Sequence, residues 1–323
     1  MNRVVFAALL SIVASGCGMP SFLVTPVENA SKLEEQTVTE GQGFAPSKIA
    51  IIEVEGMISN MKSGGFMQAT ENSVSLFTQE MERAAKDPAV KAVVLRVNSP
   101  GGTVTASDIM YETVMRFKQQ THKPVVASLQ DLAASGAYYI SCGTDKIIAH
   151  PTSVVGSIGV IFNTFNIEGT LAKIGAKSEA IKSGPLKDMG SPFRELDPAA
   201  REVMQGMVDE YYHRFVSVVT SHRSIRDPQT LKLTTDGRVF SGTRAVEVGL
   251  VDRTGLLNDA IDEAKKLGGA PGARVVMYRR PYGYSGSIYA QGATQVPQVN
   301  VMELKIPGVR DPLPSGFYYL WMP

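Results

Sequence analysis

The sequence is poor in features that define several common classes of protein. Only two cysteines, Cys17 and Cys142, occur in 323 residues, too few for a disulfide scaffold. It has no run of 18 apolar residues, which excludes a polytopic membrane protein. Its formal net charge is only +1, whereas a nucleic-acid-binding protein normally carries a basic excess. The 44% of apolar and 20% of charged residues are typical of a globular protein with a buried core.

Signatures of metal and nucleotide binding are also missing. The four histidines, His122, His150, His213 and His222, stand in no ligand spacing with cysteine, so we expect no metal and no cofactor. The glycine-containing turns lack both the Gly-Lys-Ser/Thr of a phosphate loop and the GxGxxG of a dinucleotide site. The absence of an internal repeat favours a single α/β domain.

The first residues predict an export signal. Arg3 precedes an apolar run, Val4–Ala14, of the length usual in a signal and too short to span a bilayer. Ala14-Ser15-Gly16-Cys17 resembles a bacterial lipobox. We therefore expect a lipoprotein signal over 1–16, lipid attachment at Cys17, a tether over 17–47, and an exported, membrane-anchored protein facing the periplasm. An ordinary cleaved signal or a short uncleaved anchor is the alternative.

The body of the chain alternates strand and helix patterns. Because strands joined through helices make right-handed crossovers, this order predicts a largely parallel sheet with flanking helices. We expect a domain over 48–281 and an irregular tail over 282–323, rich in Gly, Gln, Pro and Ser. The expected strands are Lys48–Glu55, Lys91–Val97, Pro124–Leu129, Lys146–Ala149, Val154–Ile161 and Arg274–Tyr278, and the expected helices are Ala106–Gln119, Ile167–Ile174, a long helix after Asp197, and Gly255–Leu267.

The long helix has the clearest signals. Asp197 is an expected N-cap before Pro198 at the first helical position. An apolar stripe at 3–4 residue steps predicts a core or subunit contact rather than a ligand site: Met204, Met207, Val208, Tyr211, Phe215, Val218 and Val219.

Two small-residue segments follow predicted strands and are candidates for chemistry. The first is Asn98-Ser-Pro-Gly-Gly102, and the second is Asp131-Leu-Ala-Ala-Ser135-Gly136-Ala-Tyr-Tyr139. If the two turns lie side by side, the amides of Gly102 and Gly136 could bind an oxyanion beside Ser135. The flanks of Ser135 are not those of the Gly-x-Ser-x-Gly elbow. An ordinary helix-capping serine is the alternative.

Ser135 needs a base, and no histidine stands in a motif. A lysine can serve if burial lowers its pKa from ~10.4 toward ~7–8. The candidates lie in a third segment, Ile181-Lys182-Ser-Gly-Pro-Leu-Lys187-Asp-Met-Gly-Ser-Pro192. Spacing alone does not choose between Lys182 and Lys187.

These segments, together with Gly156-Ser-Ile-Gly-Val160, resemble in residues and order the bacterial signal peptide peptidase A family, in its short single-repeat form. The resemblance covers about 48–268. It implies a ClpP/crotonase-like α/β fold and a Ser/Lys-dyad serine protease. It also implies substrates that are hydrophobic, unfolded peptides such as cleaved signal peptides, and a ring-shaped or dome-shaped homo-oligomer.

The resemblance also implies a role for each site residue. Ser135 matches the nucleophile, Lys187 the general base and Ser157 the hydroxyl that orients the lysine, while Gly102 and Gly136 match the oxyanion donors. Lys182 matches a non-catalytic position. The sequence departs from the family at Ala137, where glycine is usual, and in having a lipobox in place of a transmembrane anchor.

Two other functions use parts of the same pattern. A crotonase-type acyl-CoA enzyme could use the fold and paired amides to hold a thioester enolate, but it would need neither a Ser/Lys pair nor an export signal. A non-catalytic envelope scaffold would need no intact Ser135 and Lys187.

Overall fold

The computed structural model describes residues 33–42, 47–61, 72–280 and 316–321. The predicted signal 1–16, Cys17 and most of the tether lie outside these ranges. In the described part of the chain, no helix combines the length and apolarity that crossing a membrane requires.

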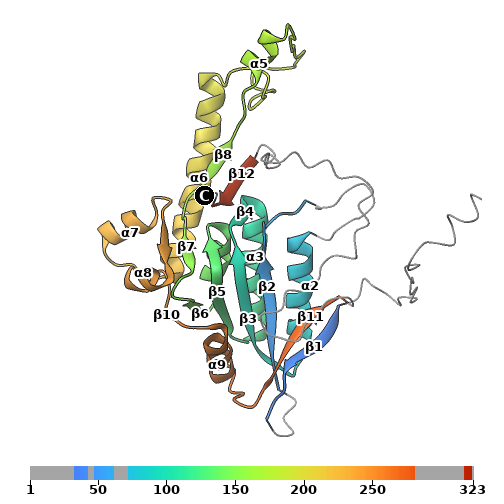
Figure 1. Cartoon of the computed structure of the whole chain (residues 1–323), viewed down its shortest axis with the longest axis vertical. Helices are drawn as coiled ribbons and strands as arrows, with labels where there is room; N and C mark the ends of the chain where they lie inside the picture. The colour runs from blue at the N-terminus through green and yellow to red at the C-terminus, as the bar shows by residue number, and fades with distance from the viewer. Residues whose placement is uncertain (1–32, 43–46, 62–71, 281–315, 322–323) are drawn as a thin grey trace, which may run out of the picture. The chain divides into compact units, whose positions relative to one another are not determined.

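The centre of the fold is a mostly parallel sheet (Figure 1). Its main strands follow the order β1-β11-β2-β3-β5-β6-β10, in which only β1 and β11 pair antiparallel. The predicted α/β class is confirmed. The bounds are β1 (Glu34–Thr39), β2 (Lys48–Glu55), β3 (Val90–Ser99), β5 (Val125–Ala134), β6 (Lys146–Ala149), β10 (Arg253–Thr254) and β11 (Arg274–Arg279).

Helices cover both faces of this sheet. Alternate side chains of β2 point to opposite faces: Ala50, Ile52 and Val54 join the core under α2 and α3, while Ile49 and Ile51 join the core under α9. Strands buried on both faces have near-continuous apolar runs, which is why β2 and β3 were readily predicted. The helices are α2 (Ser73–Lys86), α3 (Val104–Thr121) and α9 (Leu257–Leu267).

The remaining elements follow β5 in the chain. The helix predicted after Asp197 is α6 (Pro198–His222), and the Asp197 carboxylate accepts a 2.7 Å hydrogen bond from the Ala200 amide as its N-cap. Of the predicted stripe, Met204, Phe215 and Val219 are buried. The other elements are α4 (Gly136–Cys142), β7 (Val154–Gly156), β8 (Ile161–Asn163), α5 (Glu168–Lys173), α7 (Pro228–Thr234), β9 (Val239–Ser241) and α8 (Gly242–Glu247).

Three sequence-based boundaries need correction. The predicted strand Val154–Ile161 is two strands, β7 and β8, separated at Ser157, whose backbone has a φ of 52°. The expected tether 17–47 includes β1, which pairs with β11. The expected irregular tail 282–323 contains β12 (Gly316–Leu320). Pairing with residues far along the chain, rather than local propensity, makes strands of both segments.

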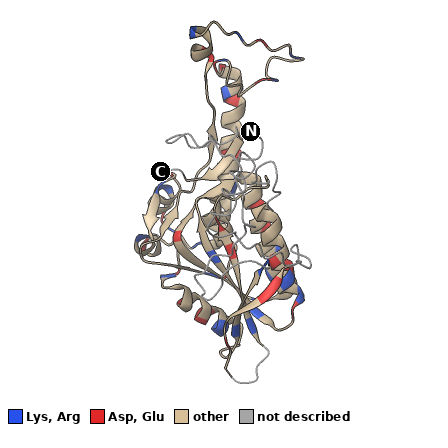
Figure 2. Cartoon of the chain, turned by 45° about the vertical axis from the view of Figure 1, so that its right-hand side comes forward, with Lys and Arg blue, Asp and Glu red and all other residues tan. Residues whose placement is uncertain are grey.

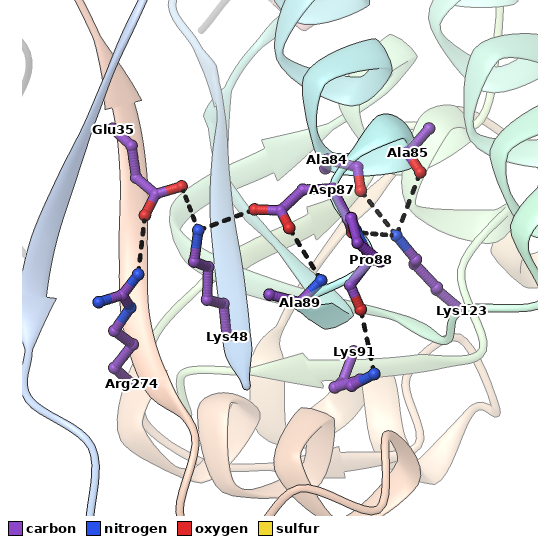
Figure 3. A network of polar contacts seen from close by, with 10 residues as sticks. All are labelled: Glu35, Lys48, Ala84, Ala85, Asp87, Pro88, Ala89, Lys91, Lys123 and Arg274. Carbon is purple, nitrogen blue, oxygen red and sulfur yellow. Dashed lines mark hydrogen bonds and ion pairs between the residues drawn. The ribbon is translucent and has the colours of Figure 1, made fainter. Parts of the chain in front are cut away.

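β1 is held by ionic contacts as well as by its ladder (Figure 3). The Lys48 ammonium lies 2.8 Å from carboxylate oxygens of both Glu35 and Asp87. Burial lowers the pKa of Lys48, but its hydrogen bonds to Asp87 and Glu35 outweigh this effect and raise it. Lys123 donates to the Ala84 and Asp87 carbonyls at the end of α2. The network joins the start of the domain to β2 and α2.

β12 belongs to a second, small antiparallel sheet. In this sheet it lies between β4 (Gly101–Thr103) and β8. The end of the chain thus pairs with the glycine segment after β3, one of the two segments singled out in the sequence.

Candidate active site

Ser135 stands between the end of β5 and the start of α4, in a backbone conformation rare for a residue with a side chain. Its φ is 54° and its ψ −117°, and such strain is typical of functional sites. The Ser135 amide donates to the Gly156 carbonyl at 2.7 Å, and the Ser135 carbonyl accepts from the Tyr139 amide at 2.9 Å. These two bonds fix the residue at the junction of strand and helix.

The Ser135 hydroxyl is buried and unused. The residue is only 1% exposed, and within the described ranges its Oγ has no hydrogen-bond partner. Its side chain makes no capping bond to α4, so it is not the ordinary helix-capping serine considered above. A buried hydroxyl without a hydrogen bond lowers the stability of the fold. Such a group therefore needs an explanation, and a role in catalysis is one explanation.

The two glycine turns lie side by side. Gly101 has a φ of 94°, and a Cβ atom there would collide with the Tyr319 carbonyl oxygen and lie 2.7 Å from the Gly136 nitrogen. A Cβ atom on Gly102 would overlap the Ile58 carbonyl and lie 2.7 Å from the Ile58 Cα. Only glycine fits at these close backbone approaches.

Ser157 lies in the turn between β7 and β8. It directly follows Gly156, whose carbonyl accepts the hydrogen bond from the Ser135 amide. Its amide donates to the Arg238 carbonyl at 2.8 Å, and the residue is 8% exposed. β7 pairs with β5 so that Gly156 lies opposite Ala134. The structure therefore brings Ser157 to the same end of β5 as Ser135.

Lys187 lies away from this group, in a stretch of 164–195 that we call the arm. Its side chain is exposed, whereas Ser135 is buried. Figure 1 shows α5, part of the arm, beside the N-terminal end of α6 and beyond the sheet. Within a single chain, the structure does not bring Lys187 to Ser135.

The arm distinguishes the two lysines that spacing left open. Lys182 donates to the Asp188 carboxylate at 2.7 Å, and Arg194 donates to the same carboxylate at 2.8 Å. The hydrogen bond from Lys182, followed by that from Arg194, holds the pKa of Asp188 below its usual range. Arg194 also reaches Asp197, the N-cap of α6. Lys182 is thus engaged in the arm's own ionic network, which does not include Lys187.

Each histidine has a role elsewhere. His222 shares a 2.8 Å hydrogen bond with the Tyr111 hydroxyl, and burial lowers its pKa. His122 is the left-handed C-cap of α3, His150 pairs with Thr152, and the His213 ring lies against Tyr212. Within the described ranges, no group of three or more His, Cys, Asp or Glu side chains could hold a metal ion. Basic and acidic positions are intermixed along the chain rather than gathered on one element (Figure 2).

An aromatic cluster adjoins Ser135, and the sequence analysis did not predict it. Tyr139, one helical turn after Ser135, has its ring centroid 5.1 Å from that of Phe215 and 5.2 Å from that of Tyr319. The Tyr139 hydroxyl donates to Asp108, which also accepts from Arg214 of α6. The stripe on α6 was the available signal, but the sequence does not tell which of its residues face α4.

Comparisons with known proteins agree with these observations. Residues 117–270 match the model of peptidase family S49. The chain is 36% identical over 250 residues to a protein of Enterococcus faecium named "Putative signal peptide peptidase SppA", covering 77% of this chain and 72% of that protein. It is 36% identical over 225 residues to Protease 4 of Haemophilus influenzae, covering 69% of this chain and 35% of that protein.

Among solved structures, a mutant of the membrane-bound stomatin-specific protease 1510-N is similar at 13% identity. The match has a TM-score of 0.40 and covers 68% of this chain and 84% of that one.

Proposed function

Because the chain belongs to peptidase family S49, the signal peptide peptidase A family, and is a serine protease, we propose that it cleaves peptides with a dyad of Ser135 and Lys187. The observation that carries the proposal is the buried, unpartnered Ser135 hydroxyl beside the turns of Gly102 and Gly136. Because the chain belongs to a peptidase family, peptide hydrolysis explains these residues better than an acyl-CoA enzyme or a non-catalytic scaffold does.

Lys187 is the lysine that best suits the role of base. Lys182 already forms an ion pair with Asp188, so its ammonium group is engaged within the arm. Lys187 makes no such contact in the described chain, so its amine is available to another site. A lysine moved from water into an apolar site loses hydration, which favours the neutral amine that a base must be.

The proposed reaction proceeds through an acyl-enzyme. Neutral Lys187 takes the proton of the Ser135 hydroxyl as its oxygen attacks the peptide carbonyl carbon, and the amides of Gly102 and Gly136 stabilise the oxyanion. The tetrahedral adduct collapses, the C–N bond breaks, and the lysine ammonium protonates the departing amine. Water, deprotonated by the same lysine, then hydrolyses the ester. Ser157 would orient the lysine through its hydroxyl.

We further propose that a second copy of the chain supplies Lys187. The arm exposes large apolar side chains of a kind that normally covers an interface: Phe165, Ile167, Ile174, Ile181, Met189 and Phe193. Packing this surface against a neighbouring copy would bury it and bring an exposed lysine to a buried serine. A closed ring of such head-to-tail contacts fits the predicted ring-shaped or dome-shaped homo-oligomer.

Mixing two inactive variants tests this arrangement. If each site takes Ser135 from one copy and Lys187 from another, an equal mixture of Ser135→Ala and Lys187→Ala subunits recovers about a quarter of wild-type activity after exchange, since each half-site is intact in half of the subunits. The rate of hydrolysis of an unfolded hydrophobic peptide is measured before and after subunit exchange.

The matched control mixes Ser135→Ala with the double variant Ser135→Ala/Lys187→Ala, which should remain inactive. Size-exclusion chromatography of differently tagged subunits verifies that they co-assemble. A co-assembled first mixture without activity would contradict the shared site.

The proposed substrates are hydrophobic, unfolded peptides, including cleaved signal peptides. The support is the cluster of buried aromatic side chains that begins one helical turn after Ser135 and includes Tyr139 and Phe215. A site lined by aromatic side chains favours extended segments with large apolar side chains over folded, polar ones.

We propose that Cys17 carries a lipid that anchors the exported chain to a membrane. The lipobox-like residues before Cys17 support this, since lipidation with two chains or more gives stable anchoring. Mass spectrometry of the protein from its native membrane should show an N-terminal peptide that begins at an acylated Cys17. Cys17→Ser should release the protein from the membrane fraction. An unmodified N-terminus at a later residue would rule the anchor out.

A further inference from the structure

The first turn of α4 carries groups on which the proposed reaction depends, and little in its own sequence fixes it. Ser135 directly precedes the helix, and Gly136, a proposed oxyanion donor, is its first residue. The helix is only seven residues long, and the side chain of Ser135 does not cap it. All seven residues are buried, so the elements packed around α4 determine where this turn lies.

Asp108 of α3 contacts α4 through Tyr139. The Tyr139 hydroxyl donates to the Asp108 carboxylate at 2.6 Å, a length typical of a strong hydrogen bond to an ionised acceptor. At the other end of the same residue, the Tyr139 amide donates to the Ser135 carbonyl at 2.9 Å. Tyr139 therefore connects the Asp108 carboxylate to the backbone of the proposed nucleophile.

Arg214 of α6 fixes the orientation of this carboxylate. Its Nε and Nη2 atoms lie 2.9 and 2.7 Å from Oδ1 of Asp108, and Nη2 also lies 2.9 Å from Oδ2. The hydrogen bonds to Asp108 raise the pKa of Arg214. Because paired bonds between a guanidinium and a carboxylate restrict their relative geometry, Asp108 is a fixed point at which α3, α4 and α6 meet.

The Tyr139 side chain is confined along its whole length. Its ring centroid lies 5.1 Å from those of Tyr111 and Phe215, and the residue is fully buried. Burial, followed by the hydrogen bond to Asp108, raises the pKa of Tyr139, so the hydroxyl stays protonated and acts as a donor. Packing thus surrounds the ring, and Asp108 fixes its polar end.

The residue before Asp108 also packs directly against Gly136. A Cβ atom on Gly136 would collide with Oγ of Ser107. Ser107 is fully buried, and its hydroxyl donates to the Thr103 carbonyl at 3.0 Å. Two successive residues of α3 therefore border the first turn of α4, one at Gly136 and one through Tyr139.

We propose that Asp108 is a positioning residue for the oxyanion site. It holds Tyr139, and Tyr139 holds the first turn of α4, so that the Gly136 amide points to the place where the oxyanion forms. This role rests on the proposed function, in which Gly136 is a donor. Oxyanion donors act mainly in the transition state, and a displacement of about 1 Å can lower a rate by about 10²-fold.

Two substitutions remove this contact from opposite sides. Asp108→Ala removes the carboxylate, whereas Tyr139→Phe removes only the hydroxyl and leaves the ring in the aromatic cluster. We expect each to lower kcat for an unfolded hydrophobic peptide by about 10- to 100-fold, with KM within about twofold of the wild-type value. Because both act through one hydrogen bond, the double variant should be as active as the weaker single variant.

Glu112→Ala is the matched control. Glu112 lies one helical turn after Asp108 on α3 and 3.6 Å from the same Arg214, but it is exposed. Its removal takes away a carboxylate without touching the bond between Asp108 and Tyr139. We expect wild-type kcat and KM. Thermal denaturation of each variant sets an assay temperature at which all of them are folded.

A peptide aldehyde distinguishes lost positioning from a general loosening of the fold. The Ser135 oxygen adds to the aldehyde carbon and the hydroxyl proton moves to the carbonyl oxygen, which then lies at the oxyanion site. We expect the inhibition constant of the aldehyde to rise by the factor by which kcat falls. Binding of an uncleaved peptide, measured after adding Ser135→Ala to each variant, should not change, whereas a loosened fold would weaken both.

The outcomes separate this role of Asp108 from the proposed function. Normal kcat in folded Tyr139→Phe would overturn the role of Asp108 even if Asp108→Ala fails to fold, and it would leave the peptidase unaffected. A double variant whose loss equals the product of the two single losses would overturn it too, since Asp108 would then not act through Tyr139. A wild-type chain that cleaves no peptide would contradict the proposed function itself, and the positioning role with it.

Discussion

Ser135→Ala and Lys187→Ala are each expected to abolish peptide hydrolysis, lowering kcat/KM by about 10⁴-fold or more. A nucleophile and its base act as one unit, so that losing either costs nearly as much as losing both. The double variant should therefore be no less active than either single variant. The measurement is the rate of cleavage of an unfolded hydrophobic peptide by each purified protein.

Lys182→Ala is the matched control for Lys187→Ala, since both residues lie in the arm. Removing Lys182 breaks one ion pair, but Asp188 keeps its contact with Arg194. An exposed pair contributes little to stability, and we expect Lys182→Ala to retain most of the activity. Full activity in Lys187→Ala, or its loss only in Lys182→Ala, would reverse the assignment of the base.

Gly102→Ala is expected to lower kcat by about 10²–10³-fold, the typical cost of losing one oxyanion donor. The new Cβ atom would overlap the Ile58 carbonyl, and because that obstacle is backbone, the turn must move. Moving the turn displaces the Gly102 amide from the oxyanion. Steady-state kinetics on a short peptide separates this loss of kcat from a change in KM.

Gly206→Ala is the control for this substitution. A Cβ atom on Gly206, in α6, meets nothing within 4 Å, and alanine suits a helix better than glycine does. We expect normal activity and equal or greater stability. If folded Gly102→Ala were as active as Gly206→Ala, the Gly102 amide would not be an oxyanion donor.

The sequence predicted the elements whose formation depends on local pattern. β2 and β6 have the predicted bounds because buried parallel strands are short, continuous apolar runs. α6 begins where Asp197 and Pro198 indicate. α2 was missed although Val74, Phe77, Met81 and Ala84 are all buried on it, at a spacing that predicts one face of a helix.

What the sequence could not predict depends on contacts between distant segments. β12 is a short aromatic strand after a long stretch rich in Gly, Gln, Pro and Ser, and it is ordered by partners more than 150 residues earlier in the chain. The position of Lys187 likewise depends on how the arm packs, which no local spacing encodes. The sequence placed Gly102, Ser135 and Gly136 after predicted strands and left their proximity as a condition, which the structure meets because β3 and β5 are neighbours in the sheet.

The antiparallel course of β1 has a consequence for orientation. Glu34, at the start of β1, lies opposite Arg279, at the carboxyl end of β11, and Ser135 follows the carboxyl end of β5. The start of β1 is therefore level with Ser128 of β5, seven residues before Ser135, because Arg279 lies beside Glu53, which is in register with Arg96 and through it with Ser128. A force applied on the N-terminal side of β1 would thus reach the domain at the edge of the sheet, through a strand that the ion pair between Lys48 and Glu35 ties to β2.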